Sequence, residues 1–408
     1  MAKEMDRSLT FVGVGSLNVY NGYHARVIEH STFRKKRVNA KSRNLIFFVN
    51  TKEYLAYLGF RVRGGPNKNT TLKRFRESFD TVLLCPFGGF YYFPLFSCAF
   101  IKFLYLFSKF RRSQIVAEGT AAGFILSFTN LDYHLDLHAL TTPEVILRAR
   151  GKSNSLATAI KCFVARYIDY RCIKYSSQLT VVSSQMRERV SKFDCSEQVE
   201  ILPCLCNNGF VEQQQRLLNS RRRELGFAVD DIIFGYAGGV GQYQCIPEML
   251  HFFKIYSNFD ARFQLLLLLA TDIDVFLKKY EWLRNNNRVK VLNVNPVVLH
   301  EYVQLMDFGL LIRAEDEVNY LSSPTKFGDY IQCGTQVITT SSVIDCSTLI
   351  KSYCLGHVIE FADISSVNQD LLNKLKSYQN SVEDRQKLKE WARDHYTWEN
   401  YDQNRLSF

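Results

Sequence analysis

The chain has 408 residues, of which 47% are hydrophobic and 22% charged, and its formal net charge is +11. This balance is typical of folded globular proteins and excludes a chain that is disordered along most of its length. The length exceeds one ordinary hydrophobic core and fits two domains of roughly 200 residues each.

Apolar runs of strand length alternate with helical patterns along the whole chain. In the first half we expect strands at residues 9–14, 45–49, 81–85, 114–117, 178–182 and 199–202, and helices at 24–30, 100–107 and 155–175. In the second half we expect strands at 232–236, 263–269, 288–292, 308–312 and 336–339, and helices at 247–256, 275–283, 296–306, 324–333 and 382–408.

Several expected strands are apolar throughout, and residues 265–269 are consecutive leucines. Such strands must be covered on both faces, as they are in parallel sheets that lie between layers of helices. Alternating strands and helices with right-handed crossovers form a doubly wound sheet. The polar segment 207–224 separates two such sets. We therefore predict an α/β fold of two Rossmann-like domains, residues 1–206 and 207–390, followed by the terminal segment 391–408.

Basic residues occur in clusters that would attract an anionic partner. The clusters are Arg34 to Arg37, then Lys73, Arg74 and Arg76, then Lys109, Arg111 and Arg112, and finally Arg221 to Arg223. We do not expect nucleic acid, because the sequence has neither a paired Cys/His zinc spacing nor an aromatic RNA-binding signature. Anionic lipid headgroups and phosphorylated substrates remain as partners.

The cysteines are irregularly spaced and form no C-x-x-C pair, which favours a reducing compartment. Residues 1–10 are charged and lack the apolar core of a signal peptide, so we expect a cytoplasmic protein. Residues 81–101 carry no charge, but Pro86 and Pro94 interrupt them. We therefore expect a strand, a loop and an aromatic-faced helix there, not a membrane span. The basic residues that follow predict peripheral contact with the inner face of the membrane.

A glycine-rich segment at 237–241 follows the expected strand 232–236. Backbone N–H groups in such a loop can approach an anion closely, which makes Gly238 and Gly239 candidate phosphate-binding residues. A tight turn that needs positive φ is the alternative interpretation. The segment is not a P-loop, because no Gly-Lys-Ser/Thr follows, and the dinucleotide-binding fingerprint is also absent.

Residues 320–334 have the pattern of a short helix between two loop segments. Ser323 is placed to cap a helix whose first residue is Pro324, and Gly334 is placed to end it. The helix dipole and the first N–H groups of such a helix form an anion site.

Two cations are expected at the start of this helix. Lys326 lies in its first turn, and Arg313 directly follows the expected strand 308–312. A cation is unfavourable at the positive end of a helix unless an anion lies nearby, and arginine can bind phosphate through two hydrogen bonds. Asp329, about one and a half turns from the expected helix start at Pro324, is suited to the vicinal hydroxyls of a ribose.

With these residues in place, the sequence resembles the retaining glycosyltransferases of family 4, also called glycosyl transferases group 1, which have the GT-B fold. The matching pieces are "LDLHAL" at 135–140, "LTVVSSQMRERV" at 179–190, "VEILP" at 199–203, "YAGGVGQYQ" at 236–244, "SSPTKFGDYIQCGTQVI" at 322–338 and "ARDHYTW" at 392–398. They follow the family's order and cover most of the chain, more weakly in the first 110 residues. The segment from Pro324 to Gly334 is the most specific of them.

The resemblance implies that the second domain binds a nucleotide-diphosphate sugar and that the first binds the acceptor. The basic charge of the first domain favours a glycan or a lipid-linked molecule as this acceptor. The donor-binding residues that the resemblance implies are Gly238, Gly239, Arg313, Ser323, Thr325, Lys326 and Asp329. Asp136 and His138 match the family's first-domain region that faces the transferred sugar. The last helical segment, 391–408, is expected to cross back to the first domain, as it does in the family.

The sequence departs from the family pattern at two places. The family's last motif has two glutamates eight positions apart, where this chain has Leu321 and Asp329. The arginine and lysine that follow the glycine loop in the family are replaced here by Gln242, Tyr243 and Gln244. Arg313 and Lys326 are the candidates to supply the missing positive charge.

The resemblance implies transfer of a sugar with retention of configuration, and we expect neither a metal nor another cofactor. Fixed N–H groups and cations at the departing diphosphate would stabilise the transition state. We take His138, Asp136, Arg313 and Lys326 as candidate catalytic residues, with Asp136 as a candidate general base. The acidic pair Asp272 and Asp274 has the spacing of a metal-binding D-x-D motif, but Asp272 is expected to cap a helix.

Two other functions stay open at this point. Leu321 in place of glutamate favours a degenerate protein that binds sugar nucleotides without turnover. A sugar-nucleotide epimerase of the same fold would interconvert donors without any acceptor.

Overall fold

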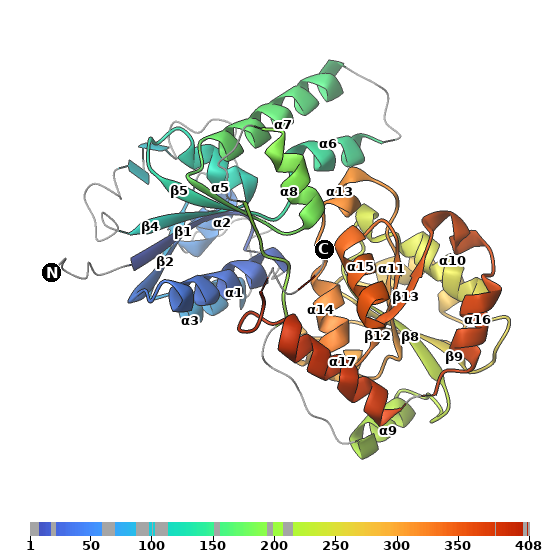
Figure 1. The fold of residues 1–408 in the computed structure, drawn as a ribbon. Helices are drawn as coiled ribbons and strands as arrows, with labels where there is room; N and C mark the ends of the chain where they lie inside the picture. The colour runs from blue at the N-terminus through green and yellow to red at the C-terminus, as the bar shows by residue number, and fades with distance from the viewer. Residues whose placement is uncertain are drawn as a thin grey trace. The chain divides into compact units, whose positions relative to one another are not determined.

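The computed structural model describes residues 8–17, 22–58, 70–86, 98–99, 101–102, 113–150, 156–193, 199–206, 215–379, 381–402 and 406. The chain divides into two compact units, Met1–Pro203 and Cys204–Phe408. This division lies three residues before the predicted boundary at 206/207. Each unit is an α/β structure in which helices cover both faces of a parallel sheet (Figure 1).

The first unit contains a seven-stranded sheet in the order β3-β2-β1-β4-β5-β6-β7. All of its strand pairs are parallel. The strands are β1 (Ser8–Val14), β2 (Ser42–Phe48), β3 (Thr81–Cys85), β4 (Gln114–Glu118), β5 (Tyr133–Leu137), β6 (Gln178–Val181) and β7 (Val199–Ile201). The helices are α1 (Gly22–Arg37), α2 (Thr51–Tyr57), α3 (Thr70–Ser78), α5 (Gly119–Leu126), α6 (Thr141–Ala149), α7 (Leu156–Lys174) and α8 (Ser184–Ser191).

The second unit contains a six-stranded parallel sheet in the order β10-β9-β8-β11-β12-β13. The strands are β8 (Ile232–Gly238), β9 (Phe263–Leu269), β10 (Val289–Leu292), β11 (Phe308–Leu311), β12 (Gln336–Thr340) and β13 (Gly356–Ile359). The helices are α9 (Gln215–Glu224), α10 (Ile246–Tyr256), α11 (Ile273–Lys279), α12 (Leu299–Val303), α13 (Glu317–Tyr320), α14 (Thr325–Gln332), α15 (Ile344–Tyr353), α16 (Gln369–Lys376) and α17 (Val382–His395).

The two doubly wound sheets confirm the predicted α/β fold class. The five leucines at 265–269 lie in β9 and are at most 2% exposed, as a strand covered on both faces requires. In each sheet the chain order reverses beside the first strand, between β1 and β4 in one unit and between β8 and β11 in the other. Ligands of such sheets bind beyond the carboxyl ends of the strands at this reversal.

Several element predictions need correction. The helix expected at 24–30 is longer, because α1 begins at Gly22 and continues through the basic run to Arg37. The helix expected at 275–283 is instead α11, with Asp272 as its cap, and a separate turn at Glu281–Leu283. The helix expected at 100–107 lies largely outside the described residues.

The last helix, α17, ends at His395, not at residue 408, and packs on α14 within the second unit. Its Arg385 donates to Asp307 at 2.8 Å, and Arg222 of α9 donates to the same carboxylate oxygen at 2.8 Å. The other oxygen of Asp307 accepts the N–H of Ile233 at 2.8 Å. One buried carboxylate thus joins α9, α17 and β8. The predicted crossing of 391–408 to the first domain stays a prediction.

No helix in the described part of the chain combines the length and the apolar content that crossing a membrane would require. The uncharged segment 81–101 is described only in part. Its first five residues form the predicted strand, β3. The rest of the segment, and the basic residues Lys109, Arg111 and Arg112, lie mostly outside the described residues, and the predicted membrane contact of this segment stays a prediction.

Candidate functional site

The glycine loop at the end of β8 is shaped around a lysine side chain. Gly238 has a φ of +142°, and a Cβ atom at this position would lie 2.6 Å from Cε of Lys326. The backbone therefore requires glycine here both for its dihedral angle and for the lysine that packs on it. A Cβ atom at Gly239 would meet nothing within 4 Å, so this part of the loop borders open space.

Helix α14 places Lys326 against this loop. Its Tyr330 accepts a hydrogen bond from the N–H of Ala237 at 3.2 Å, next to Gly238. The ring of Tyr330 fits because β11 has glycine at position 309, where a Cβ atom would lie 2.4 Å from the ring. Close packing of α14 on two strands therefore fixes the first turn of the helix beside the end of β8.

The predicted cap of α14 is wrong. The helix begins at Thr325, and the cap residue is Pro324, which has no side-chain oxygen to offer. The Ser323 hydroxyl instead accepts the N–H of Cys204 at 2.9 Å. The start of α14 is therefore without a side-chain cap, and Thr325, its first residue, is exposed. Gly334 follows the helix with a φ of +72°, as predicted.

Arg313, directly after β11, is a buried cation. Its side chain is 3% exposed, and its guanidinium carbon lies 5.5 Å from the ring centroid of Tyr243, in the loop after Gly238. Burial lowers the pKa of this guanidinium. No carboxylate in the described part of the chain forms an ion pair with Arg313. The neighbours of its charge are instead the ring of Tyr243 and the carbonyl oxygen of Ile312, which accepts from Arg313 at 3.4 Å.

Lys326 is half-buried and stands close to a second positive charge. Its ammonium lies 5.3 Å from the ring centroid of Tyr236. Burial above all, and then the nearby Arg313, lower its pKa to about 7, whereas Asp329 acts in the opposite direction. It also forms no ion pair with any described carboxylate. We call Arg313 and Lys326 the cation site.

The cation site has the properties of an anion-binding site. Two positive side chains, the uncapped start of α14 and the open backbone at Gly239 come together at the carboxyl ends of β8 and β11. Uncompensated cations in a partly desolvated place cost free energy, which a bound anion recovers. A group with two or more negative charges, such as a diphosphate, matches this arrangement.

Asp329 lies one turn after Lys326 and already has protein partners. One of its oxygens lies 3.1 Å from Nε2 of His300 and 3.4 Å from the amide nitrogen of Gln332. Its carboxylate is 30% exposed, so it remains accessible, and its role toward a ribose stays a prediction. Leu321 is buried and packs within the fold. Asp272 caps α11 by accepting the N–H of Val275 at 3.1 Å, as expected.

The predicted pair Asp136 and His138 belongs to a buried group of charges in the first unit. Nε2 of His138 lies 2.6 Å from one Asp136 oxygen and 3.1 Å from a Glu118 oxygen. Arg26 of α1 donates to both oxygens of Asp136 at 2.9 Å. Nδ1 of His30 lies 2.8 Å from Glu118. We call these five residues the charge cluster.

The charge cluster balances its own charges. Burial would raise the pKa of Asp136, but Arg26 above all, then His30 and His138, hold it well below its usual range. Burial opposes the charged form of His138, but Asp136 and then Glu118 raise its pKa. His138 is 15% exposed, whereas Asp136 and Glu118 are fully buried. His138 is therefore the member that can touch a ligand, and Asp136 orients it.

Three members of the cluster have the spacing of metal ligands. Nitrogen or oxygen atoms of His30, Glu118 and Asp136 all lie within 4.8 Å of one another. Arg26, however, already holds both Asp136 oxygens and also donates to the carbonyl oxygens of Leu202 and Pro203 at 2.9 Å. A divalent ion would have to displace this guanidinium, so these residues fit a metal poorly.

Sequence reasoning missed Glu118, Arg26 and His30. Glu118 directly follows the apolar run 114–117, and the end of a parallel strand is where polar residues gather in such folds. Arg26 and His30 are four residues apart on α1, so they share one face of the helix. In the sequence Tyr243 is visible only as a departure from the family pattern. The structure places its ring next to the Arg313 guanidinium.

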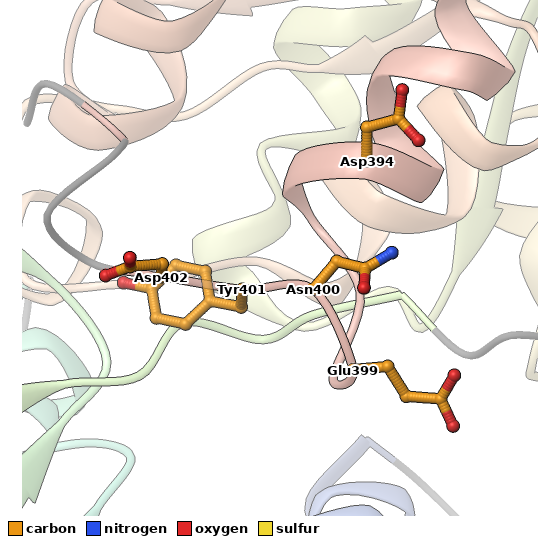
Figure 2. Close-up of a pocket in the computed structure, with 5 residues that line it drawn as sticks. All are labelled: Asp394, Glu399, Asn400, Tyr401 and Asp402. Carbon is orange, nitrogen blue, oxygen red and sulfur yellow. The ribbon is translucent and has the colours of Figure 1, made fainter.

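A separate acidic pocket lies in the C-terminal segment of the second unit. It is lined by Asp394, Glu399, Asn400, Tyr401 and Asp402 (Figure 2). Its three carboxylates make it unsuited to a phosphate, so it is not the site expected for the predicted donor.

No protein-family model matches the sequence, and neither does any curated protein. Among solved structures, the chain is similar to HepE from Anabaena in complex with UDP-glucose, with 10% identity, a TM-score of 0.65 and 96% of each chain covered. It is similar to the catalytic domain of starch synthase IV from Arabidopsis thaliana bound to ADP and acarbose, with 12% identity, a TM-score of 0.61 and 96% of each chain covered.

A putative UDP-N-acetylglucosamine 2-epimerase from Listeria monocytogenes is also similar, with 9% identity and a TM-score of 0.52 over 97% of this chain and 92% of the other. At such low identities these likenesses establish the fold alone. The chain has the GT-B fold, two Rossmann-like domains each built on a parallel sheet.

Proposed function

We propose that the protein is a glycosyltransferase that takes a sugar from a nucleoside-diphosphate sugar held by its second unit. The observation that carries this proposal is the cation site. Arg313 and Lys326 lie beside a glycine loop and an uncapped helix start, and neither has a carboxylate ion-pair partner among the residues described. A diphosphate supplies the charge that this site lacks. Neighbours of the same fold include proteins solved with UDP-glucose and with ADP.

The cation site would act most strongly when the sugar leaves. Cleavage of the bond to the anomeric carbon leaves an additional negative charge on the diphosphate. Lys326, Arg313 and the N–H groups at the start of α14 are fixed before this charge develops, so they stabilise the transition state more than the bound donor. The pKa of Lys326, near 7 without ligand, rises beside an anion, so the bound lysine is protonated.

In the first unit, His138 is proposed to contact the transferred sugar or the acceptor. The two carboxylates at its Nε2 favour its protonated form and fix its ring. Asp136 is proposed as a positioning residue, because it is fully buried and bound by Arg26. A general base must reach the proton that it removes, so we propose this positioning role for Asp136 in place of the predicted role as general base.

Finer features of the function rest on the resemblance to family 4. We propose that transfer proceeds with retention, that no metal ion or further cofactor takes part, and that the acceptor is a glycan or a lipid-linked sugar. We propose a cytoplasmic location because the spacing of the cysteines shows no disulfide framework. We propose contact with the inner face of the membrane because basic residues cluster in the first unit.

The test is a panel of UDP-, ADP- and GDP-sugars, measured first by thermal shift and then by donor hydrolysis or transfer. A true donor raises the unfolding temperature by mass action. Lys326→Ala should lower turnover about a hundredfold. This is the usual loss when an enzyme loses one fixed hydrogen-bond donor that stabilises the negative charge of the transition state. Lys351→Ala, an exposed lysine on α15, is the matched control and should leave turnover unchanged.

Buried Leu321 favours one alternative, a protein that binds sugar nucleotides without turnover. In that case a nucleotide sugar stabilises the protein, Lys326→Ala abolishes the stabilisation, and no donor in the panel is hydrolysed or transferred. Conversion between free donors in the absence of an acceptor would instead identify an epimerase. No stabilisation by any member of the panel would overturn the proposal of a donor site.

A further inference from the structure

Helix α7 carries a continuous stripe of exposed apolar and aromatic side chains. The stripe consists of Leu156, Ile160, Phe163, Tyr167 and Tyr170. Their spacing of four, three, four and three residues places them on one side of the helix. Leu156 is 79% exposed and Phe163 72%, which is unusual for large apolar side chains on a folded unit.

The stripe faces away from the core of the first unit, except that the ring of Tyr167 lies 6.1 Å from the ring of buried Phe124 in α5. The buried side of α7 packs on α5 and α6 and consists of Ala165, Ile168, Asp169, Cys172 and Ile173. Contact there is close: a Cβ atom at Gly123 of α5 would lie 2.9 Å from Cβ of Cys172. No residue from 156 to 164 is buried, so the first half of α7 extends beyond the packed body of the unit (Figure 1).

The charges on the exposed surface of α7 have one sign. Lys161, Arg166 and Lys174 are exposed. The single acidic residue of the helix, Asp169, is buried and accepts the N–H groups of Thr141 and Thr142 at 2.8 Å. The exposed charged residues of α7 are therefore all cations, and Arg166 and Lys174 lie on the half of the helix that carries the stripe.

Aromatic rings and an arginine extend this surface at the C-terminal end of the helix. The Arg171 guanidinium lies 3.9 Å from the ring centroid of Phe128 and 4.5 Å from that of exposed Tyr175. Lys174 lies 5.3 Å from the ring centroid of Tyr170. Tyrosine rings next to cations are typical of the boundary between lipid headgroups and acyl chains.

We propose that the exposed stripe of α7 docks the protein onto an anionic lipid bilayer, with the helix parallel to the membrane plane. Phe163 and its apolar neighbours would enter the headgroup–acyl boundary, while Arg166 and Lys174 contact anionic headgroups. The charges favour this occupant over a second copy of the chain. Two copies paired through this stripe would bring the same cations together without any acidic partner on either helix.

This surface differs from the segment 81–112, for which membrane contact was predicted from sequence. It also does not depend on the proposed transferase activity, because lipid binding is measured without donor or acceptor.

The test is co-sedimentation of the full chain with vesicles of phosphatidylcholine alone and of phosphatidylcholine mixed with phosphatidylglycerol. We expect binding to the mixed vesicles that weakens with added salt. Phe163→Glu should weaken it at least about tenfold, because the apolar ring that enters the bilayer is lost and a negative charge is added near anionic headgroups. Arg166→Gln and Lys174→Gln should each weaken it about fivefold.

Phe259→Glu is the matched control, since Phe259 is 47% exposed on the second unit, and it should leave vesicle binding unchanged. Equal binding by the wild type and by Phe163→Glu would overturn the proposal. So would a wild-type dimer that Phe163→Glu dissociates, without any vesicle binding. Stabilisation by a nucleotide sugar in the same Phe163→Glu preparation keeps the two proposals separate, because that variant leaves the cation site intact.

Discussion

The cation site and the charge cluster lie at corresponding places in their sheets, but only the charge cluster pairs its cations with carboxylates of the described residues. Both are built where parallel strands end, beside the reversal of strand order. In the charge cluster, Arg26 is matched by Asp136 at two contacts of 2.9 Å. In the cation site, Arg313 is equally buried and has no such partner among the described residues.

This difference separates two uses of buried charge. A cluster that is balanced internally holds a side chain, here His138, in one orientation and protonation state. A site with excess charge is unfavourable by itself and becomes favourable when a ligand of the opposite sign binds. Burial and strand position are therefore weak guides to a ligand site, and the missing partner is the informative feature.

The largest contrast should appear when each arginine is replaced by methionine. Arg26→Met leaves Asp136 buried without its main partner, and we expect the free energy of unfolding in urea to fall by about 3–5 kcal/mol. Arg313→Met removes an uncompensated cation, and without ligand it should change that free energy by no more than about 1 kcal/mol, in either direction.

The exposed Arg148→Met is the control, because its ion pair with Glu144 is worth on the order of 0.5 kcal/mol. Equal large losses for Arg26→Met and Arg313→Met would show that Arg313 is a structural residue like Arg26.

The two loop glycines allow a sharper test of the cation site. Gly238→Ala forces an alanine to a φ of +142° and against Lys326, so we expect a loss of about 1–3 kcal/mol in stability and loss of donor-induced stabilisation. Gly239→Ala meets open space and should change stability by less than about 0.5 kcal/mol. Thermal shift with and without the best donor of the panel measures both effects. Tolerance of alanine at 238 would contradict the described packing of Lys326.

Donor affinity should depend on pH through Lys326. Its pKa without ligand is about 7, and the anion binds the protonated form. Affinity is then constant below pH 7 and falls by up to about tenfold per pH unit above it, until the pKa of the bound lysine is reached. Lys326→Met should remove this dependence in isothermal titration. A profile that is the same in the wild type and in the variant would exclude Lys326 from the donor site.

Lys326 affects folding stability in the opposite direction to donor affinity as the pH rises. Because the pKa of Lys326 is lowered in the folded protein, the unfolded chain holds one more proton between about pH 7 and the ordinary lysine value, so this residue's contribution to stability rises with pH in that window.

The smallest expected effect is that of Ser323→Ala. The hydroxyl accepts the N–H of Cys204 and does not cap α14, so its loss should lower stability by about 1 kcal/mol. Donor affinity should stay within about twofold, since no hydrogen bond at the start of the helix is lost. A fall in affinity of tenfold or more would restore the original interpretation of Ser323 as part of the anion site.

Much of the fold could be predicted because its signals are local. The leucines of β9, the glycines after β8, the proline before α14 and Gly334 after it each act within a few residues. The least accurate bounds were those of α1 and α17, whose polar ends carry no apolar pattern. The cation site was also predictable, because Lys326 and Arg313 directly follow recognisable boundaries of local structure.

The sequence by itself determined two α/β units with parallel sheets and brought Gly238, Arg313 and Lys326 to the ends of neighbouring elements. Only the tertiary structure decided which charges are paired. Arg26 and Asp136 are separated by 110 residues, His30 and Glu118 by 88, and Cys204 and Ser323 by 119. A charged side chain has many partners of the opposite sign within a chain, and only packing selects the one that it meets in place of water.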